Sequence, residues 1–363
     1  MRVVCKDEVL QFIKEDNEKH VVVMPDFFLD RIVSICYDVK KFAAMLSSVT
    51  VRKGGSIDEV AQEDIIGGNA VNTASALAAL GAKVTPIVCT DEFGLQKIKF
   101  LLRQYRLDLS HIKIVEKTSV TTALEFEDAN GKKNVMLRDL GSLTEFGPSN
   151  LDDRDYELIE DADYLCLFNW AGTRKFGTKL AETVFSRIKT RGKGKTYFDT
   201  ADPTPNMAKI PELLENVLKK RQVDILSLNE NEAVSYGAIL DEDIAKSCGK
   251  KRLEKLAMDA ARVLAKNLSA RIDLHTTAFS GTFTRKQEIT VPAFEIKPLR
   301  ATGAGDAWNA GNILGDGSGL SDEGRLTLAN AVSACYLTDP RGLHPTRERL
   351  TQFMQKCELS RPK

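Results

Sequence analysis

Short apolar runs separated by amphipathic stretches fill the second half of the chain. The apolar runs lie at 164–168, 196–199, 224–228 and 271–277. Between them, apolar residues recur at helical spacing at 178–190, 206–220 and 252–267. Strands of this kind that alternate with helices form parallel sheets covered on both faces. The pattern therefore predicts an α/β fold with a doubly wound, mainly parallel sheet flanked by helices.

The first half of the chain continues this pattern but contains two polar regions. Buried strands are predicted at 21–24 (VVVM) and 84–90 (VTPIVCT), and a tightly packed helix at 69–80. Polar, alternating residues at 49–64 and 118–138 predict exposed strands, the second pair joined by an Asn-Gly hairpin turn. Such strands do not fit a buried sheet, so we expect them to form a small β lid.

The first 20 residues predict a helical extension. Four apolar residues between positions 9 and 13 share one helical face. Charges throughout the segment argue against a signal peptide, and no apolar run approaches the roughly 20 residues of a membrane span. We therefore expect an extension at 1–20 and one domain at 21–363 that carries the lid and has no membrane contact.

Composition narrows the class of partner. Among 363 residues, 51 Lys and Arg balance 51 Asp and Glu, so no basic surplus favours nucleic acid. The seven cysteines are scattered and form no CxxC pair, which argues against a disulfide framework or a zinc knuckle. Free cysteines are typical of the reducing cytosol. We expect a soluble, cytoplasmic protein that acts on a small molecule.

The stretch RATGAGDAWNAG at 300–311 is the first candidate for chemistry. Gly303 and Gly305 let backbone N–H groups converge at the start of an apolar helix, where the unpaired donors favour an anion. Asp306 in the first turn could then act as a general base on a hydroxyl that attacks a phosphoryl group. The alternative is a carboxylate that only caps the helix. Trp308 replaces the third glycine that a dinucleotide fingerprint requires.

Two further helix starts carry polar groups. Gly67 and Gly68 permit a close backbone approach, with the amide of Asn72 on the first turn of the helix that follows. Asn229 and Glu232 share one face after the apolar strand 224–228, where they could hold a hydrated magnesium ion. Taken singly, each start is also explained by helix capping and close packing.

In order and spacing, these pieces resemble the ribokinase-like (PfkB) family of carbohydrate and nucleoside kinases. The similar stretches are GGNAVNTASALAALGA with TDEFG, LNENE, ATGAGDAWNAG and LANAVSACYLTDPRGLHPT. The resemblance extends from about residue 21 to 350. It implies a Mg²⁺-dependent phosphotransferase that moves the γ-phosphoryl group of ATP to a hydroxyl of a sugar, nucleoside or related polyol.

The resemblance also implies roles for individual residues. Asp306 would be the catalytic base, and Glu232 with Asn229 would order magnesium and phosphates, with Glu232 reaching the metal through water. The anion hole for the transferred phosphate falls on Gly303, Ala304 and Gly305. The acceptor contacts fall on Asp30, Gly67, Gly68 and Asn72. The nucleotide-lining positions are Thr276, Gly281 and Asn330.

Further acceptor contacts are expected where the strand at 164–168 ends. Ligands bind at the carboxyl edge of such sheets, and Asn169, Trp170 and Arg174 follow this strand. Trp170 could stack on a base, and Arg174 or Arg138 could hold a substrate phosphate. The alternative for each is ordinary packing or a solvated arginine.

Two positions depart from the family pattern. Relatives usually read Asp-Thr where this chain has Arg300 and Ala301, and in many of them that aspartate helps to hold a monovalent cation. A guanidinium there should abolish such a site, because like charges would meet. Either Arg300 supplies the positive charge itself, making activity independent of potassium, or it points to solvent. Ala278 replaces a glycine of the nucleotide pattern, so ADP remains a candidate donor beside ATP.

Two alternative functions and a possible oligomeric state remain open at this stage. The acceptor could be a sugar phosphate, which would require a basic acceptor pocket. The chain could also be a non-catalytic ligand-binding protein on the same fold. Exposed lid edges further suggest a homodimer formed through the lid.

Overall fold

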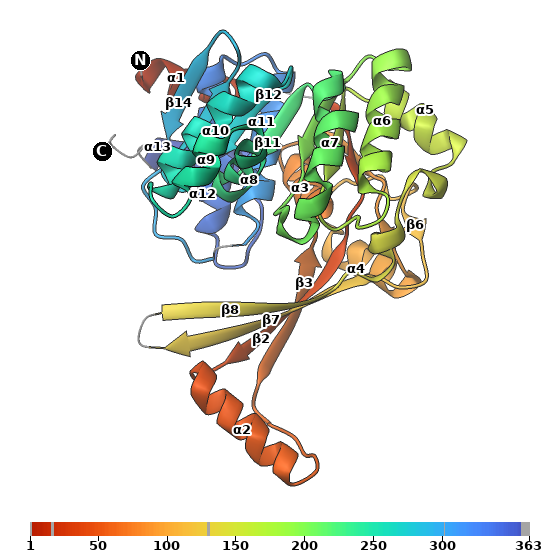
Figure 1. Ribbon diagram of the computed structural model, residues 1–363, viewed down its shortest axis with the longest axis vertical. Helices are drawn as coiled ribbons and strands as arrows, with labels where there is room; N and C mark the ends of the chain where they lie inside the picture. Colours follow the sequence, from red (N-terminus) through yellow and green to blue (C-terminus); the bar gives the residue numbers. More distant parts are fainter. Residues whose placement is uncertain (1, 16–17, 129–130, 301, 357–363) are drawn as a thin grey trace.

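The computed structural model describes residues 2–15, 18–128, 131–300 and 302–356 (Figure 1). Its central sheet has eight strands in the order β14-β13-β12-β11-β10-β9-β1-β4, parallel from β12 to β4 and antiparallel at β13 and β14. The strands are β1 (His20–Met24), β4 (Lys83–Pro86), β9 (Tyr164–Phe168), β10 (Lys195–Asp199), β11 (Ile225–Leu228), β12 (Arg271–His275), β13 (Phe279–Phe283) and β14 (Glu288–Pro292). The predicted doubly wound sheet is thereby confirmed.

Helices cover both faces of this sheet because neighbouring strand residues point to opposite sides. In β9, for example, Leu165 and Leu167 enter one apolar cluster, whereas Cys166 and Phe168 enter the other. The first face is covered by α5 (Asp153–Asp161), α6 (Gly177–Arg191), α7 (Ile210–Asn216), α8 (Glu230–Leu240), α9 (Glu242–Ser247) and α10 (Leu253–Asn267). The second is covered by α1 (Arg2–Lys14), α3 (Asn69–Ala79), α11 (Ala304–Gly317), α12 (Asp322–Leu337) and α13 (Arg347–Lys356).

Helix α1 forms most of the predicted N-terminal extension. The segment is helical, as expected, but it packs against α12 and α13, and Val9 is fully buried in the core of the second face. Its apolar stripe is therefore part of the main core rather than a separate appendage. No helix in the described ranges is long and apolar enough to cross a membrane.

The lid is a separate sheet of four strands in the order β3-β2-β7-β8, which projects from the body (Figure 1). Its strands are β2 (Phe28–Ile35), β3 (Ala61–Gly67), β7 (Ser119–Asp128) and β8 (Gly131–Asp139). The hairpin expected at 118–138 is present as β7 and β8, although Asn130 of its turn lies outside the described residues.

The lid prediction for 49–64 is wrong over most of its length. Residues Val39–Val51 form helix α2 at the far end of the lid, and the strand begins only at Ala61. Asp38 caps this helix by accepting a hydrogen bond from the Lys41 N–H at 2.8 Å. The predicted boundary at residue 49 falls inside this helix, so the segment 49–64 carries only the last residues of its helical spacing.

Shorter elements complete the fold. The apolar segment 84–90 is split into β4 and β5 (Cys89–Thr90), and β5 pairs with β6 (Lys113–Ile114) beside helix α4 (Glu92–Leu101). The helix expected at 206–220 is broken into α7 between two 3₁₀ turns. The 3₁₀ helices are Gly141–Glu145, Pro148–Asn150, Thr204–Lys209 and Leu218–Lys220.

Candidate active site

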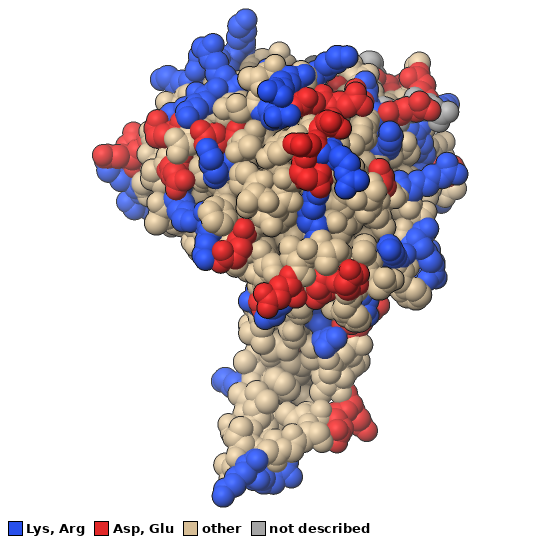
Figure 2. Space-filling view, turned by 90° about the vertical axis from the view of Figure 1, so that its right-hand side faces the viewer, with Lys and Arg blue, Asp and Glu red and all other residues tan. Residues whose placement is uncertain are grey.

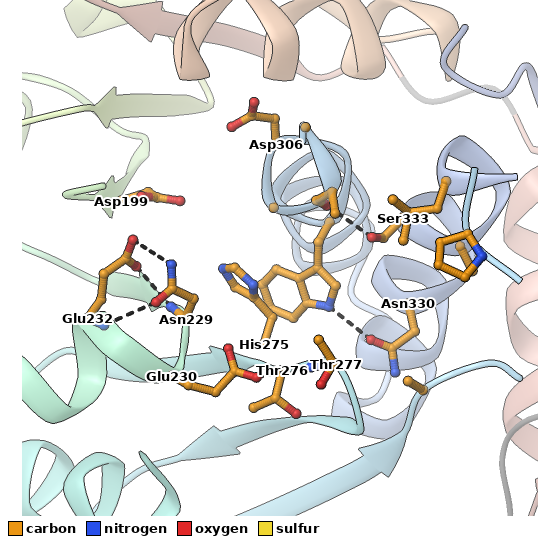
Figure 3. Close-up of a pocket in the computed structure, with 18 of the residues that line it drawn as sticks. Asp199, Asn229, Glu230, Glu232, His275, Thr276, Thr277, Asp306, Asn330 and Ser333 are labelled. Atoms are coloured by element: carbon orange, nitrogen blue, oxygen red, sulfur yellow. Dashed lines mark hydrogen bonds between the residues drawn. The ribbon is translucent and has the colours of Figure 1, made fainter. Parts of the chain in front are cut away.

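A cavity of about 620 Å³ opens where the parallel strands end (Figure 3). It is bounded by the carboxyl ends of β10, β11 and β12 and by the N-termini of α8 and α11. Ligands of doubly wound sheets bind at this edge. The cavity therefore brings together three positions that the sequence indicated separately: the Asn229–Glu232 pair, Thr276 and the segment 303–306.

Asp306 lies in the first turn of α11 and is held by two amides from α3. Asn69 Nδ2 donates to its Oδ1 at 2.8 Å, and Asn72 Nδ2 donates to its Oδ2 at 3.0 Å. Burial raises the pKa of Asp306 to about 8, with the negative charge of Asp199 acting in the same direction and the two amides opposing it. A carboxylate that is oriented in this way and titrates near neutrality suits general base chemistry. Asn72, which was expected at the acceptor, contacts Asp306 here.

The glycine turn before Asp306 forms a cradle at the N-terminus of α11. Gly303 has φ of 78°, in the left-handed region that favours glycine, and a Cβ there would lie 2.6 Å from Tyr336 Oη. A Cβ on Gly305 would lie 3.3 Å from His275 Cε1. The first N–H groups of a helix have no partner within it, so those of Ala304 and Gly305 are suited to an anion.

Asn229 and Glu232 form a capping box at the start of α8. Asn229 Oδ1 accepts from the Glu232 N–H at 3.1 Å, and Glu232 Oε2 accepts from the Asn229 N–H at 2.9 Å. Both residues also line the cavity, so the pair that caps the helix is also available to a ligand. Burial, followed by the charge of Asp199, raises the pKa of Glu232 well above its usual value.

Asp199, which the sequence reasoning missed, lies between Glu232 and Asp306 in the view of Figure 3. It ends β10 and accepts hydrogen bonds from Asn309 Nδ2 at 2.7 Å and from the Ala201 N–H at 3.0 Å. Burial raises its pKa as well. Its position offered a signal, because an acid directly after an apolar strand lies at the ligand-binding edge of the sheet.

Asp26 is a second buried acid that was missed. It follows β1, is fully buried, and accepts hydrogen bonds at 2.9 Å from the N–H groups of Asn69 and Ala70. A carboxylate at the start of α3 satisfies unpaired helix donors and the helix dipole. Asp26 thus fixes the helix that presents the Asn69 amide to Asp306.

Comparison with protein families shows which family the chain belongs to. A model of the pfkB family of carbohydrate kinases matches residues 34–348. This chain belongs to the pfkB family. The resemblance expected from the four motifs is confirmed, and the protein is a carbohydrate or nucleoside kinase.

Solved kinases share the fold of this pfkB protein. Ribokinase from Cryptococcus neoformans in complex with ADP has a TM-score of 0.69 at 17% identity, covering 93% of this chain and 99% of that one. Arabidopsis thaliana ribokinase complexed with ribose and ATP has a TM-score of 0.66 at 19% identity, with coverages of 93% and 99%. Adenosine kinase from Sinorhizobium meliloti has a TM-score of 0.67 at 18% identity, with coverages of 89% and 94%. No curated protein matches the sequence.

On the lid side of the kinase, Asp30 has a carboxyl oxygen without a partner. Its Oδ1 is buried and accepts no hydrogen bond from the described residues. A Cβ on Gly67 would lie 2.2 Å from Asp30 Oδ2, so only glycine at 67 leaves room for this carboxylate. Gly68 caps α3 with φ of 97°, and a Cβ there would lie 3.0 Å from Asp26 O. Burial raises the pKa of Asp30 to about 6.

The strand-end residues 169–174 do not line the cavity. Asn169 Nδ2 donates to Asp26 Oδ2 at 2.8 Å, so it supports Asp26. Trp170 is 1% exposed and donates to Thr178 Oγ1 at 3.1 Å, which excludes the expected stacking on a base. Arg174 is partly buried, and its Nη1 donates to Asn206 Oδ1 at 3.1 Å.

Two of the three positions expected to line the nucleotide face the cavity. Thr276 and Asn330 line it, and Asn330 Oδ1 accepts from Trp308 Nε1 at 3.0 Å. Gly281 does not line it, because it lies within β13, where a Cβ would meet the Phe283 ring at 2.9 Å. Strand β13 begins at Phe279, so Gly281 lies within the sheet rather than in the turn after β12.

His275 is a cavity residue that the sequence analysis did not identify. Its ring lies 4.9 Å from the Trp308 ring, and its buried Nε2 has no hydrogen-bond partner in the described chain. Burial lowers the pKa of His275 to about 4, so the imidazole is neutral at pH 7.

The two departures from the family pattern have local explanations. Arg300 Nη2 donates to the Asp339 carbonyl oxygen at 2.7 Å, and its guanidinium lies 5.5 Å from the centre of the Tyr336 ring. Of the two alternatives for Arg300, the one in which it points to solvent is therefore wrong. Ala301 lies outside the described residues. Ala278 is exposed and does not line the cavity, so its methyl group does not crowd a nucleotide there.

Proposed function

We propose that this kinase transfers the γ-phosphoryl group of ATP, with Mg²⁺, to a hydroxyl group of a sugar, nucleoside or related polyol. The observation that supports this most strongly is the Asp306 carboxylate beside the glycine cradle of α11. The proposed base and the proposed anion site thus lie within one helical turn of each other. Phosphoryl transfer needs this combination, because a proton leaves the acceptor as charge builds on the phosphoryl oxygens.

In the proposed reaction, Asp306 accepts the proton of the acceptor hydroxyl. The acceptor oxygen forms a bond to the γ-phosphorus as the bond from that phosphorus to ADP breaks. Asn69 and Asn72 hold both carboxylate oxygens of Asp306 in place during this step. The N–H groups of Ala304 and Gly305 donate to the phosphoryl oxygens and stabilise their charge.

The residues around the cavity fit a magnesium ion held mainly through water and phosphate. Within the described ranges, no cluster of three ligating side chains could hold a metal by itself. Mg²⁺ commonly keeps several waters and binds substrate phosphates with one or two carboxylates. Burial raises the pKa values of Asp199 and Glu232, and the charge of Asp199 raises that of Glu232 further, so a cation near them would relieve this repulsion. When bound, Mg²⁺ would neutralise phosphate charge.

The direct test is a coupled ADP-release assay over sugars, nucleosides, inositols and sugar phosphates. A parallel series with ADP as donor would follow AMP formation. We expect turnover with MgATP and at least one hydroxyl acceptor. Ala278 does not line the cavity, so its methyl group gives no reason to prefer ADP as the donor. A non-catalytic ligand-binding protein would give no turnover with any acceptor, and that result would overturn the proposal.

We also propose that the kinase forms a homodimer through its lid. β8 is an edge strand that exposes Val135, Met136 and Leu137, which alternate between the two faces of the sheet. Figure 2 shows that much of the lid on one side of the molecule carries uncharged side chains. An unpaired edge flanked by apolar groups favours pairing with a second copy. Light scattering should give twice the chain mass, and Met136→Lys should shift it towards the monomer.

A cytoplasmic location remains part of the proposal. Cys36, Cys89, Cys166 and Cys248 are free thiols in the described part of the chain. Free thiols and an ATP-dependent reaction both suit a reducing compartment that contains ATP.

A further inference from the structure

Four neighbouring strands of the central sheet carry a row of buried polar side chains beneath α11. Asp199 on β10 is directly opposite Ser227 on β11. Ser227 is in turn opposite Asp273 on β12, which is opposite Thr282 on β13. Each of the four is at most 5% exposed. Residues that are directly opposite in a sheet project to the same side, so the row leads from the cavity, at Asp199, into the interior of the protein.

Helix α11 adds two amides to this row. Asn309 Nδ2 donates to Asp199 Oδ2, and Asn309 Oδ1 accepts from Tyr197 Oη, both at 2.7 Å. One turn later, Asn312 Nδ2 donates to Tyr197 Oη at 3.1 Å and to Asp273 Oδ2 at 2.9 Å. Both asparagines are fully buried. Asp199, which lines the cavity, is thereby connected to side chains that do not line it.

The far end of this connection is Arg325 on α12. Its side chain is 1% exposed, and its Nη1 donates to Asn312 Oδ1. A guanidinium has only donors and stays protonated, so Asn312 must turn its oxygen towards Arg325 and its nitrogen towards Tyr197. The Tyr197 oxygen then accepts from Asn312, and the single proton of its hydroxyl is left for Asn309. Arg325 therefore sets the direction of every hydrogen bond along this path.

We propose that this path, from Arg325 to Asn309, is a positioning relay that keeps the Asp199 carboxylate directed at a cation and phosphates in the cavity. If the Asn309 amide were turned over, its oxygen would face Asp199, and neither atom would have a proton to share. The carboxylate would then lose a hydrogen bond and move. The inference rests on the proposed phosphotransferase function and deepens it, because it names residues outside the cavity on which cation binding depends.

Two hydroxyl groups share the task of orienting the Asn309 amide. Besides Tyr197, Ser227 Oγ donates to Asn309 Oδ1 at 2.7 Å. Loss of one hydroxyl leaves the other in place, whereas loss of both leaves the amide free to turn. The relay therefore predicts a small effect of each single substitution and a larger, non-additive effect of the double substitution.

The test uses Tyr197→Phe, Ser227→Ala, their combination, and Asn309→Leu, which removes the last donor of the relay at similar volume. The control is Tyr164→Phe. Tyr164 lies on the neighbouring strand β9 and is also buried, but its hydroxyl donates to Asp316 instead of Asn309. Electron paramagnetic resonance follows the binding of Mn²⁺ to each protein in saturating ADP. The kcat with MgATP, the KM of the best acceptor of the screen and the Tm are measured beside it.

We expect the double variant to lose about 10- to 100-fold in Mn²⁺ affinity and in kcat, the range for a hydrogen bond to a charged group. Each single variant should lose less than about threefold, because one hydroxyl remains. Asn309→Leu should match the double variant, and adding Tyr197→Phe to it should have no further effect. The KM of the acceptor should stay within about twofold throughout, since the relay does not touch the acceptor. Tyr164→Phe should keep wild-type Mn²⁺ affinity even where its Tm falls.

Three results would overturn the relay and leave the kinase proposal standing. Wild-type Mn²⁺ affinity in the double variant would show that Asp199 is held without it. An equal loss in Tyr164→Phe would assign the effect to general destabilisation. A further loss when Tyr197→Phe is added to Asn309→Leu would show that Tyr197 acts by another route. If the wild type neither binds Mn²⁺ with ADP nor releases ADP from MgATP with any acceptor, the proposed function itself fails.

Discussion

Asn72 Nδ2 donates a hydrogen bond to Asp306 Oδ2 at 3.0 Å, joining side chains that are 234 residues apart. The contact connects the helix after β3 with the glycine cradle of α11. Two motifs that could each be explained as helix capping therefore meet at one carboxylate. This shared contact favours a single reaction site over two unrelated capped helices.

Replacing Asn72 by Ala should move the pH dependence of the reaction. The Asn72 hydrogen bond lowers the pKa of Asp306, which burial raises to about 8, so its loss should raise that pKa further. A base is active when deprotonated, and the acid limb of kcat/KM should therefore shift to higher pH. The pH profiles of wild type and variant measure this shift. An acid limb that stays in place would show that Asp306 is not the group titrated.

Asp306 should also make the kinase less stable as pH rises. Its folded pKa of about 8 exceeds the ordinary value of 3.8, so the unfolded chain releases this proton first. Stability is then lost progressively between about pH 4 and pH 8. Asp306→Asn should have the higher Tm at pH 8, and the difference should vanish near pH 4. Asp58→Asn, which removes an exposed lid carboxylate, serves as the control. A difference independent of pH would contradict the linkage.

Gly67→Ala should impair the acceptor side selectively. The added methyl would lie 2.2 Å from Asp30 Oδ2, so the carboxylate must move away from its position. We expect KM for the acceptor to rise by about 10-fold or more, comparable to losing a hydrogen bond to a charged group. The affinity for MgATP should stay within about twofold. Equal loss of both affinities would indicate general distortion of the fold.

Because of Arg300, we expect the kinase activity to be independent of potassium. It binds the carbonyl oxygen of Asp339 and lies over Tyr336, whose hydroxyl is next to Gly303 of the cradle. A fixed guanidinium near this position disfavours a second cation. Exchanging sodium for potassium at constant ionic strength should change kcat by less than about twofold. A several-fold increase would refute this role.

The sequence predicts the central sheet well because fully buried parallel strands appear as continuous apolar runs. The run YLCLF at 164–168 coincides with β9, in which every residue is buried. The sequence alone therefore does not show which of its residues face which layer of helices. Helix α2 was missed because no motif marks it and because the polar, alternating residues at 49–64 favoured exposed strands. The local sequence pattern therefore predicted the central sheet and its covering helices but not the elements that form the lid.

The candidate site was only partly predictable for a related reason. Asp306 and the Asn229–Glu232 pair belong to motifs with fixed spacing, whereas Asp26 and Asp199 are single acids whose importance depends on distant partners. Trp170 illustrates the opposite error. A tryptophan at the end of a strand can face a ligand or the core, and the Thr178 hydroxyl that fixes it in the core lies on a later helix.

The central claim is that Asp306 is the base in phosphoryl transfer, and single-turnover kinetics of Asp306→Asn test it most directly. The measurement follows the transfer of labelled γ-phosphate from ATP to the best acceptor of the screen. We predict a rate lower by about 10²- to 10⁴-fold, the usual contribution of a general base, with the affinity for MgATP unchanged within about twofold. A rate equal to that of the wild type would contradict the claim.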